Sequence, residues 1–560
     1  MVLADYEWGA RLLKAGHERL AASAQGRLRV LMFARCDRLS REAATRWLEA
    51  QPEGDGVAGT IDLRASVDRA EFTEAIAQIH AAIAAGETYQ VNYTYRLHGS
   101  AYGSPLALYR VLRERQPVAF GAYVALPPGE EATHVLSCSP ELFVRAQQGL
   151  VTAKPMKGTA ARYAPPEGDS ETARLLSEDV KNRAENLMIV DLLRNDLGRV
   201  AEIGSVKVPE LFAIEPYSTV FQMTSTVQAR LRPEIGMPEL LRAVFPCGSI
   251  TGAPKHHTMQ LIARLESTPR GLYCGAIGWV DAPRPGARLG DFCLSVAIRT
   301  LTLGPDRDGR RALTLGVGAG IVKDSRADDE FDECRLKARF LTGLAPGFEL
   351  FETVLCTAAG ELPWLQRHLD RLARSATVLG FTFDRDTARA QLEAAATERR
   401  GMPRRLRLAL ANDGRLTLTQ AALSPLPEGE VRLRIAEARL PDANPLAAHK
   451  TTLRALYDAG VREAEREGAF DSLFFSESGW LVEGGRCSVF VKLQGRWFTP
   501  PLADGALPGV MRAALLEDAA FGARERRLTR ADLEQAEAVM VCNALRGALL
   551  AHVLRTDTVS

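Results

Sequence analysis

The sequence predicts a mixed α/β protein of the α+β kind, built from two domains. With 560 residues, the chain is too long for a single hydrophobic core. Its apolar residues alternate between helical and strand spacing along the whole length. One short segment rich in Gly and Pro, 342–347, directly follows a charged helical stretch. We therefore expect a first domain over residues 1–341, a linker over 342–347 and a second domain over 348–560.

Local patterns predict the individual elements. Apolar residues at helical spacing over 68–85, followed by Gly86, predict a helix that ends at the glycine. The alternating stretch 89–95 predicts a strand. Residues 177–196 predict one long helix closed by Gly198. Further strands are predicted at 28–33, 118–124, 141–144 and 348–354, and further helices at 41–49 and 328–340.

Composition argues against several functional classes. The 70 basic and 69 acidic residues are interspersed, so neither nucleic acid nor a membrane surface is an expected partner. The first residues lack the pattern of a signal peptide, and no apolar run reaches the ~18 residues of a membrane span. The nine cysteines form no CxxC pair, which favours free thiols over disulfides or zinc. We expect a cytoplasmic protein.

Two predicted helices carry carboxylates that chemistry could use. Glu330 and Glu333 are spaced i and i+3, and Lys337 follows Glu333 at i+4, so all three share one helix face. Oxygen ligands of this kind suit Mg²⁺, although an exposed acidic helix has the same pattern. Glu185 lies at the edge of the apolar face of the helix 177–196, where a solvated side chain is the simpler interpretation.

Glycine-rich segments and one lysine complete the set of unusual features. Segments 248–255 and 316–322 would let backbone N–H groups approach an anion closely. Neither has the context of a P-loop or a Rossmann fingerprint, so a carboxylate is a better ligand than a nucleotide. Lys157 stands between Met156 and Gly158, an unusual place for an amine unless chemistry needs it.

In their order along the chain, these segments resemble the chorismate-utilising enzymes, the family of the anthranilate synthase and aminodeoxychorismate synthase large components. The resemblance covers about residues 60–340 and implies packed antiparallel sheets with outer helices. It rests on Tyr89-Gln90-Val91-Asn92, on Ser139-Pro140-Glu141-Leu142-Phe143, and on segments 154–159, 183–196, 248–255, 298–300 and 318–337.

The resemblance implies a role for each matched residue. Glu141 matches the general acid for the departing C4 hydroxyl of chorismate, which requires a raised pKa. Glu185 and Glu333, with Glu330 in support, match a Mg²⁺ site that neutralises a substrate carboxylate. Substrate contacts are implied for Thr251, Arg299 and Lys337, for the backbone near Gly318 and Gly320, and for Gln222, which stands where many relatives have histidine and cannot act as an acid.

Lys157 separates the subclasses of this family. Anthranilate synthases carry alanine at this position, and aminodeoxychorismate synthases carry lysine. An amine there can add at C2 as the C4 hydroxyl leaves, after which ammonia attacks C4 and expels the lysine. Gln90 stands where isochorismate-forming relatives have a water-activating lysine, which disfavours that chemistry. No glutaminase motif is present, so ammonia is expected from a separate glutamine amidotransferase subunit or from solution.

The last third contains segments 367–372, 449–452, 481–490, 507–512 and 542–545, which resemble the fold class IV pyridoxal phosphate enzymes. That class includes aminotransferases and 4-amino-4-deoxychorismate lyase, and it implies two subdomains and a homodimer by analogy. By position, Lys450 would form the Schiff base and Glu483 would pair with the pyridinium nitrogen. The phosphate would be bound by Arg371, by the backbone amides of Gly509 and Val510, and by Asn543.

The segments around Lys450 and Asn543 look more like the lyase, which eliminates pyruvate to give p-aminobenzoate. The predicted product of the first domain is then the substrate of the second, so the leading hypothesis is a bifunctional p-aminobenzoate synthase that feeds folate synthesis. One alternative is anthranilate synthase component I fused to a branched-chain or D-amino-acid-type aminotransferase, against which Lys157 argues. Another is a scaffold of decayed enzyme domains, which would have lost the matched site residues.

Overall fold

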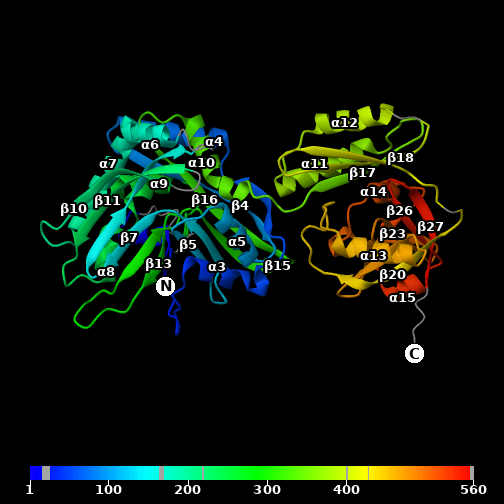
Figure 1. Ribbon diagram of the computed structural model, residues 1–560, viewed down its shortest axis with the longest axis horizontal. Helices are drawn as coiled ribbons and strands as arrows, with labels where there is room; N and C mark the ends of the chain where they lie inside the picture. Colours follow the sequence, from blue (N-terminus) through cyan, green and yellow to red (C-terminus); the bar gives the residue numbers. More distant parts are fainter. Residues whose placement is uncertain (16–25, 163–168, 217–219, 399–400, 427, 555–560) are drawn as a thin grey trace. The chain divides into compact units, whose positions relative to one another are not determined.

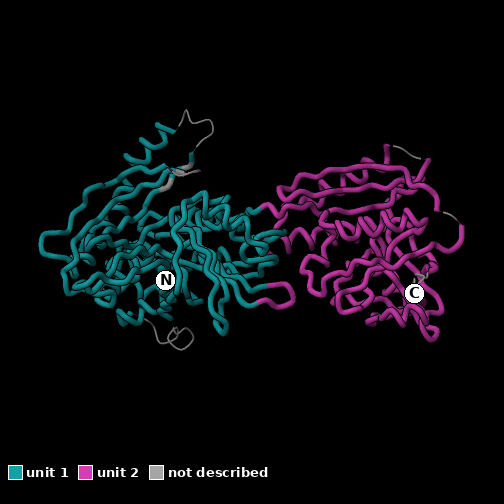
Figure 2. The backbone as a smooth tube through the Cα atoms, turned by 60° about the horizontal axis from the view of Figure 1, so that its bottom comes forward, with its two compact units in different colours: residues 1–58, 63–305, 311–344 teal, residues 59–62, 306–310, 345–560 magenta. Residues whose placement is uncertain are grey.

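The computed structural model describes residues 1–15, 26–162, 169–216, 220–398, 401–426 and 428–554 (Figure 1). Its backbone divides into two compact units (Figure 2). The first contains Met1–Ala58, Leu63–Pro305 and Arg311–Leu344, and the second contains Gly59–Asp62, Asp306–Arg310 and Ala345–Ser560. The main division therefore falls between Leu344 and Ala345. Within the described ranges, no helix has the length and apolar character needed to cross a membrane.

Two large sheets form the first unit, as the predicted fold class requires. In both sheets, the strand pairs whose register is described are antiparallel, for example residues 120–125 with 134–139 and residues 142–147 with 150–154. One sheet has the order β10 (Lys207–Pro216), β11 (Val220–Arg230), β8 (Leu150–Lys154), β7 (Leu142–Gln147), β14 (Phe292–Val296), β13 (Ala276–Val280), β1 (Val2–Ala4), β2 (Leu28–Val30), with β9 (Met156–Ala161) beside β11. The other has the order β12 (Gly252–Ala253), β4 (Gln90–Tyr102), β16 (Arg310–Ile321), β15 (Thr300–Arg307), β6 (His134–Ser139), β5 (Phe120–Ala125), with β3 (Gly59–Ala65) beside β4.

Helices cover these sheets (Figure 1). Asp68 and Glu71 form a capping box at the start of the helix predicted over 68–85. The single helix predicted over 177–196 is two helices, because Asp179 is extended and its carboxylate accepts the N–H of Asn182 to begin a new one. The helices are α1 (Tyr6–Leu12), α3 (Arg41–Glu49), α4 (Arg69–Ala84), α5 (Pro105–Arg115), α6 (Asp169–Glu178), α7 (Val180–Gly198), α8 (Met237–Val244), α9 (Lys255–Leu265) and α10 (Ala327–Thr342), with short 3₁₀ turns at Pro52–Gly54 and Gly248–Ile250.

The core of the first unit explains how α7 is oriented. Its residues Ile189, Val190, Leu193 and Leu197 are buried at helical spacing and belong to the core cluster that also contains Phe143 of β7. This face holds the helix against the sheet, and Glu185 remains half-buried one turn before Ile189. Because the apolar face of α7 packs on the sheet, its polar face, which carries Glu185, remains accessible for a binding site.

The second unit has two subdomains, in agreement with the predicted fold. A small sheet of β17 (Leu350–Cys356), β18 (Arg404–Leu410) and β19 (Leu416–Ala422) is accompanied by α11 (Leu365–Leu379) and α12 (Arg385–Glu398). A larger sheet has the order β22 (Leu481–Gly484), β21 (Asp471–Ser476), β20 (Val431–Leu440), β27 (Gly547–Val553), β26 (Ala538–Asn543), β23 (Ser488–Leu493), β24 (Arg496–Thr499), β25 (Arg524–Glu525). With it are α13 (Ala455–Arg466), α14 (Val510–Glu517), α15 (Arg530–Glu534) and a 3₁₀ turn at Leu502–Asp504.

Candidate active sites

Glu141 is a buried carboxyl with a raised pKa. It precedes β7 and is 4% exposed. Burial raises the pKa of Glu141 to about 7, against the opposing effects of a hydrogen bond from Ser249 and of the charge on Lys157. The Ser249 hydroxyl donates to Glu141 Oε1 at 2.7 Å. A carboxyl in this state carries a proton near neutral pH, as a general acid must.

Lys157 lies in the same part of the unit. Its Nζ is 2.9 Å from the position that a Cβ on Gly320 would occupy, and Gln90 Nε2 is 2.8 Å from that position. A side chain at residue 320 would therefore collide with both groups, which explains the glycine there. The neighbouring Lys154 forms an ion pair with Glu215, so its charge is already compensated.

Lys337 connects α10 to β16. Its Nζ pairs with Glu333 at 2.7 Å and donates to the Gly318 carbonyl at 2.9 Å. Burial acts to lower the pKa of Lys337, but the attraction of Glu333 outweighs it and the pKa is raised. Gly318 itself packs against β4, where an added Cβ would lie 2.4 Å from the Thr94 methyl group. The structure thus brings Gly318, Gly320, Glu333 and Lys337 together near Lys157.

The carboxylates predicted to hold Mg²⁺ come from α7 and α10. Burial acts to raise the pKa of Glu333, but Lys337 and the more distant Lys157 and Lys181 lower it, so Glu333 is ionised. Glu330 accepts a hydrogen bond from the Ser325 hydroxyl at 2.6 Å, and burial raises its pKa. Over the described part of the chain, no three His, Cys, Asp or Glu side chains lie close enough together to hold a metal. The donor chemistry of Glu185 and Glu333 nevertheless suits Mg²⁺, which needs only one or two protein carboxylates.

Three further predicted substrate contacts lie on different segments. The Thr251 hydroxyl donates to the carbonyls of Cys247 and Gly248, at 3.1 and 3.2 Å, and is fully buried. Arg299 has a positive φ of 49°, and its guanidinium donates to Gln116, at the end of α5, when the Gln116 amide is turned so that its oxygen faces the arginine. Gln222 is buried on β11, opposite Thr159 of β9.

The second unit contains a cavity of about 650 Å³ around Lys450, named here the Lys450 pocket. Burial, together with the charges of Arg371 and Arg454, lowers the pKa of Lys450 to about 7. Its Nζ lies 5.0 Å from the centroid of the Phe351 ring. A lysine with this pKa presents a neutral amine for a large fraction of the time at neutral pH, which is the form that attacks a carbonyl group.

One corner of the Lys450 pocket brings three predicted phosphate-binding residues together. Arg371 Nη1 donates to the Pro508 carbonyl at 2.9 Å, next to Gly509 and Val510 at the start of α14. The same guanidinium is held by Glu352, at 2.8 Å from Nε and 2.7 Å from Nη2. A helix start beside an arginine is a favourable place for an anion.

His368 shares this corner of the Lys450 pocket. Its Nδ1 lies 2.7 Å from Glu352, and its buried Nε2 has no hydrogen-bond partner among the described residues. The orphaned nitrogen and the arginine would suit the binding of a phosphate group.

Glu483 and Asn543 also line the Lys450 pocket. Glu483 accepts hydrogen bonds from the Tyr457 hydroxyl at 2.8 Å and from the Leu507 N–H at 3.1 Å, and burial raises its pKa. Asn543 uses its side chain within its own surroundings: Nδ2 donates to Cys487 Sγ at 3.1 Å, and Oδ1 accepts the N–H of Arg546 at 2.8 Å.

The charge of the Lys450 pocket is strongly one-sided. Among the described residues that line it, six are lysine or arginine and only Glu483 is acidic. Such a cavity concentrates anions. The cationic residues are Arg371, Arg405, Lys450, Arg454, Arg486 and Arg546.

Sequence reasoning missed several of these residues. Ser249 lies inside the glycine-rich segment 248–255, but nothing in that segment indicates which distant carboxyl it contacts. The resemblance relates Gln90 only to a lysine of isochorismate-forming relatives, whereas in the structure its two buried amide atoms have no hydrogen-bond partner in the described ranges. Glu352, in a strand of apolar and mixed residues, gave no signal at all.

Comparisons with known proteins agree with this architecture. Residues 19–343 match the model of the chorismate binding enzyme family, and residues 349–552 match that of the class IV amino-transferases. The chain is 40% identical over 337 residues to aminodeoxychorismate synthase component 1 of Klebsiella aerogenes, covering 60% of this chain and 68% of the relative. It is 40% identical over 281 residues to anthranilate synthase component 1 of Streptomyces coelicolor, covering 50% of this chain and 52% of the relative.

Among solved structures, anthranilate synthase component I of Streptococcus pneumoniae is 27% identical, with a TM-score of 0.48 and coverage of 60% of this chain and 79% of that chain. The chain spans only about half of the length of the Streptomyces coelicolor relative. Because the first model covers more than half of the 560 residues, the chain belongs to the chorismate binding enzyme family and continues into a class IV amino-transferase domain.

Proposed function

We propose that this chain makes p-aminobenzoate from chorismate in two steps. The first domain, residues 1–341, aminates chorismate at C4 with ammonia to give 4-amino-4-deoxychorismate and water. The second, residues 348–560, eliminates pyruvate from that product to leave p-aminobenzoate. The observation that carries the proposal is that Lys157 lies near enough to the buried carboxyl of Glu141 for its charge to lower the pKa of that carboxyl.

In the first step, Glu141 gives its proton to the C4 hydroxyl, which leaves as water. Its pKa of about 7 supports this role, because the acid is protonated near neutral pH. The Lys157 amine adds at C2 as the C4–O bond breaks. Ammonia then forms the new bond at C4 and the bond between Lys157 and C2 breaks, which restores the lysine and leaves the enolpyruvyl group in place.

Cations hold the dicarboxylate in the first site. Glu185 and Glu333 would bind Mg²⁺, with Glu330 in support, and the ion would neutralise one carboxylate of chorismate. Lys337 and Arg299 would bind carboxylate oxygens, with the backbone near Gly320. Thr251 and Gln222 would complete the contacts to the substrate.

The second step uses the Lys450 pocket, where the class IV match implies pyridoxal phosphate. When bound, this cofactor supplies an electron sink. Arg371, the start of α14 at Gly509 and Val510, and Asn543 would hold its phosphate, and Glu483 its ring nitrogen. The Lys450 amine would take up and return the proton that leaves the ring of the substrate, for which a pKa of about 7 is well suited.

The alternative function, anthranilate synthesis joined to a branched-chain or D-amino-acid-type aminotransferase, keeps the same fold but changes both reactions. Overall identity does not separate them, because the relatives named for the two first-domain reactions are both 40% identical. Lys157 favours amination at C4. In the second domain, four arginines of the Lys450 pocket remain besides Arg371, and they favour a substrate with two carboxylates over a branched-chain amino acid, whose apolar side chain needs an apolar pocket. These are Arg405, Arg454, Arg486 and Arg546.

Two partners complete the proposal. A separate glutamine amidotransferase would supply ammonia, and the second domain would form a homodimer. Both are tested by purifying the chain, measuring its mass in solution, and comparing ammonium salts with glutamine as the nitrogen source. We expect the purified chain to be a dimer that uses ammonium, but not glutamine, as its nitrogen source.

The reaction itself is tested with chorismate, ammonium and Mg²⁺, with and without pyridoxal phosphate, followed by mass spectrometry of the products. We expect 4-amino-4-deoxychorismate without the cofactor, and p-aminobenzoate with pyruvate when it is present. Anthranilate as the only product would refute the first step. Formation of p-aminobenzoate by cofactor-free protein would refute the second.

A further inference from the structure

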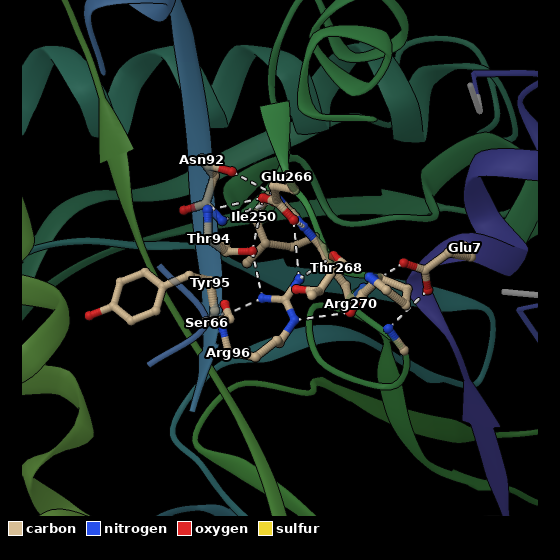
Figure 3. A network of polar contacts seen from close by, with 12 residues as sticks. Glu7, Ser66, Asn92, Thr94, Tyr95, Arg96, Ile250, Glu266, Thr268 and Arg270 are labelled. Carbon is tan, nitrogen blue, oxygen red and sulfur yellow. Dashed lines mark hydrogen bonds and ion pairs between the residues drawn. The ribbon is translucent and has the colours of Figure 1, made fainter. Parts of the chain in front are cut away.

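The first unit contains a buried network of charged residues (Figure 3). Arg96, Glu266 and Arg270 are at most 6% exposed, and Glu7 is 9% exposed. Glu266 binds both arginines: Oε1 accepts from Arg270 Nη2 at 2.6 Å, and Oε2 accepts from Arg96 Nη2 at 3.1 Å. Such a network lowers stability if it is left half-paired, so its presence calls for a reason.

Arg270 uses its remaining donors on the backbone of two separate segments. Nη1 donates to the Ile250 carbonyl at 2.8 Å, and Nη2 donates to the Asn92 carbonyl at 2.6 Å. Asn92 contacts the same segment, because its Nδ2 donates to the Ile250 carbonyl at 3.1 Å and its N–H to the Thr251 carbonyl at 2.8 Å. The turn that contains Ile250 is therefore clamped to β4 (Figure 3).

The clamped carbonyl lies between two residues of the first site. Ser249 precedes it and donates to Glu141, and Thr251 follows it. Two donors converge on one carbonyl oxygen and fix the position of Ile250, so a displacement of this turn would break both bonds and move the adjacent Ser249 relative to Glu141. The geometry of the general acid thus depends on a guanidinium that has no place in the reaction.

Arg270 is itself held from the N-terminal segment. Glu7 of α1 accepts the backbone N–H of Arg270 at 2.6 Å and that of Gly271 at 3.0 Å. The Arg270 guanidinium lies 4.4 Å from the centroid of the Tyr6 ring. Both residues precede residue 19, where the match to the family model begins.

We propose that Arg270 is a positioning residue of the first site, which holds Ser249 on Glu141, and that Glu7 fixes Arg270 from ahead of the family-matching region. The inference rests on the proposed amination of chorismate. The alternative is that the network only stabilises the fold. In that case, substitution of any of its residues would lower stability and activity together.

Arg96 offers a matched control. It is as deeply buried as Arg270 and binds the same Glu266, but its other side-chain bonds go to the Thr94 hydroxyl and to the carbonyls of Tyr95, Thr268 and Pro269, none of them in the turn that contains Ile250. Arg270→Lys and Arg96→Lys should therefore lower the melting temperature to a similar extent. Only Arg270→Lys should reduce kcat for chorismate amination, by about 10- to 100-fold as expected for a misplaced catalytic group, with KM for chorismate little changed.

The pH profile separates positioning from stability. The Ser249 hydrogen bond lowers the pKa of Glu141, so its loss in Arg270→Lys should move the alkaline limb of kcat to higher pH, as in Ser249→Ala. The other ionisable groups facing Glu141 are Lys157, Lys337 and Cys247, which are unchanged in both variants. Arg96→Lys should leave the limb in place.

Asn92→Ala tests the same clamp if Arg270→Lys does not fold, because it removes a second donor to Ile250 and leaves the pair of Arg270 with Glu266 intact. It should shift the limb in the same direction. The inference would be overturned if Arg270→Lys and Arg96→Lys lost kcat equally with no shift of the alkaline limb. It would also be overturned if Asn92→Ala had the pH profile of the wild type. If wild-type protein does not aminate chorismate, the proposed function fails instead.

Discussion

Ser249→Ala provides a quantitative test of Glu141 as the acid. Its hydroxyl is 2.7 Å from a carboxylate that is 4% exposed, so few other donors can replace it. A hydrogen bond to a charged group contributes about 1.5–3 kcal/mol, and about 1.4 kcal/mol corresponds to one pH unit. Because the bond favours the ionised form, its removal should raise the pKa of Glu141.

The assay is the rate of chorismate consumption from pH 6 to 10 at a constant concentration of free ammonia. An acid that must be protonated loses activity as the pH rises through its pKa, which is about 7 in the wild type. In Ser249→Ala this alkaline limb should move upward by about one to two pH units. Ser295→Ala is the control, since that buried hydroxyl donates to the Ile277 carbonyl. An unchanged or downward-shifted limb would refute the assignment of Glu141.

Three further predictions concern single residues. Lys157→Ala should lose C4 amination far more than chorismate or Mg²⁺ binding, measured by product analysis beside calorimetric titration; equal losses would make it a substrate-anchoring lysine. Lys450→Ala should abolish covalent trapping of pyridoxal phosphate by borohydride, read as protein mass, while Lys492→Ala retains it. Glu352→Gln should lower the free energy of unfolding by about 3–5 kcal/mol at pH 7, because it leaves Arg371 buried without its partner. Arg371 and His368 outweigh burial and lower the pKa of Glu352, so the difference in unfolding free energy between the two proteins should shrink as the pH falls below about 4. Urea unfolding at several pH values measures this difference, and a constant value would contradict the prediction.

Local sequence was sufficient where the physics is local. Asp68 and Gly86 marked the ends of a helix because capping and positive φ depend on neighbouring residues alone. It was insufficient at Asp179, where a cap inside a continuous helical pattern divides α6 from α7. The period of apolar residues continues across such a break, so only the backbone reveals it.

By itself, the sequence determined which chemical groups the protein possesses: an amine at Lys157, a carboxyl at Glu141 and a second amine at Lys450, each in a segment of recognisable order. Tertiary structure alone decided the pKa of Glu141 and of Lys450. The pKa of Glu141 depends on burial and on Ser249, 108 residues away in the chain. The clamp by Arg270 joins Asn92, 178 residues away, to the same site. Desolvation and hydrogen bonding act through distance in space, and the residues that impose them here come from segments that no local pattern connects.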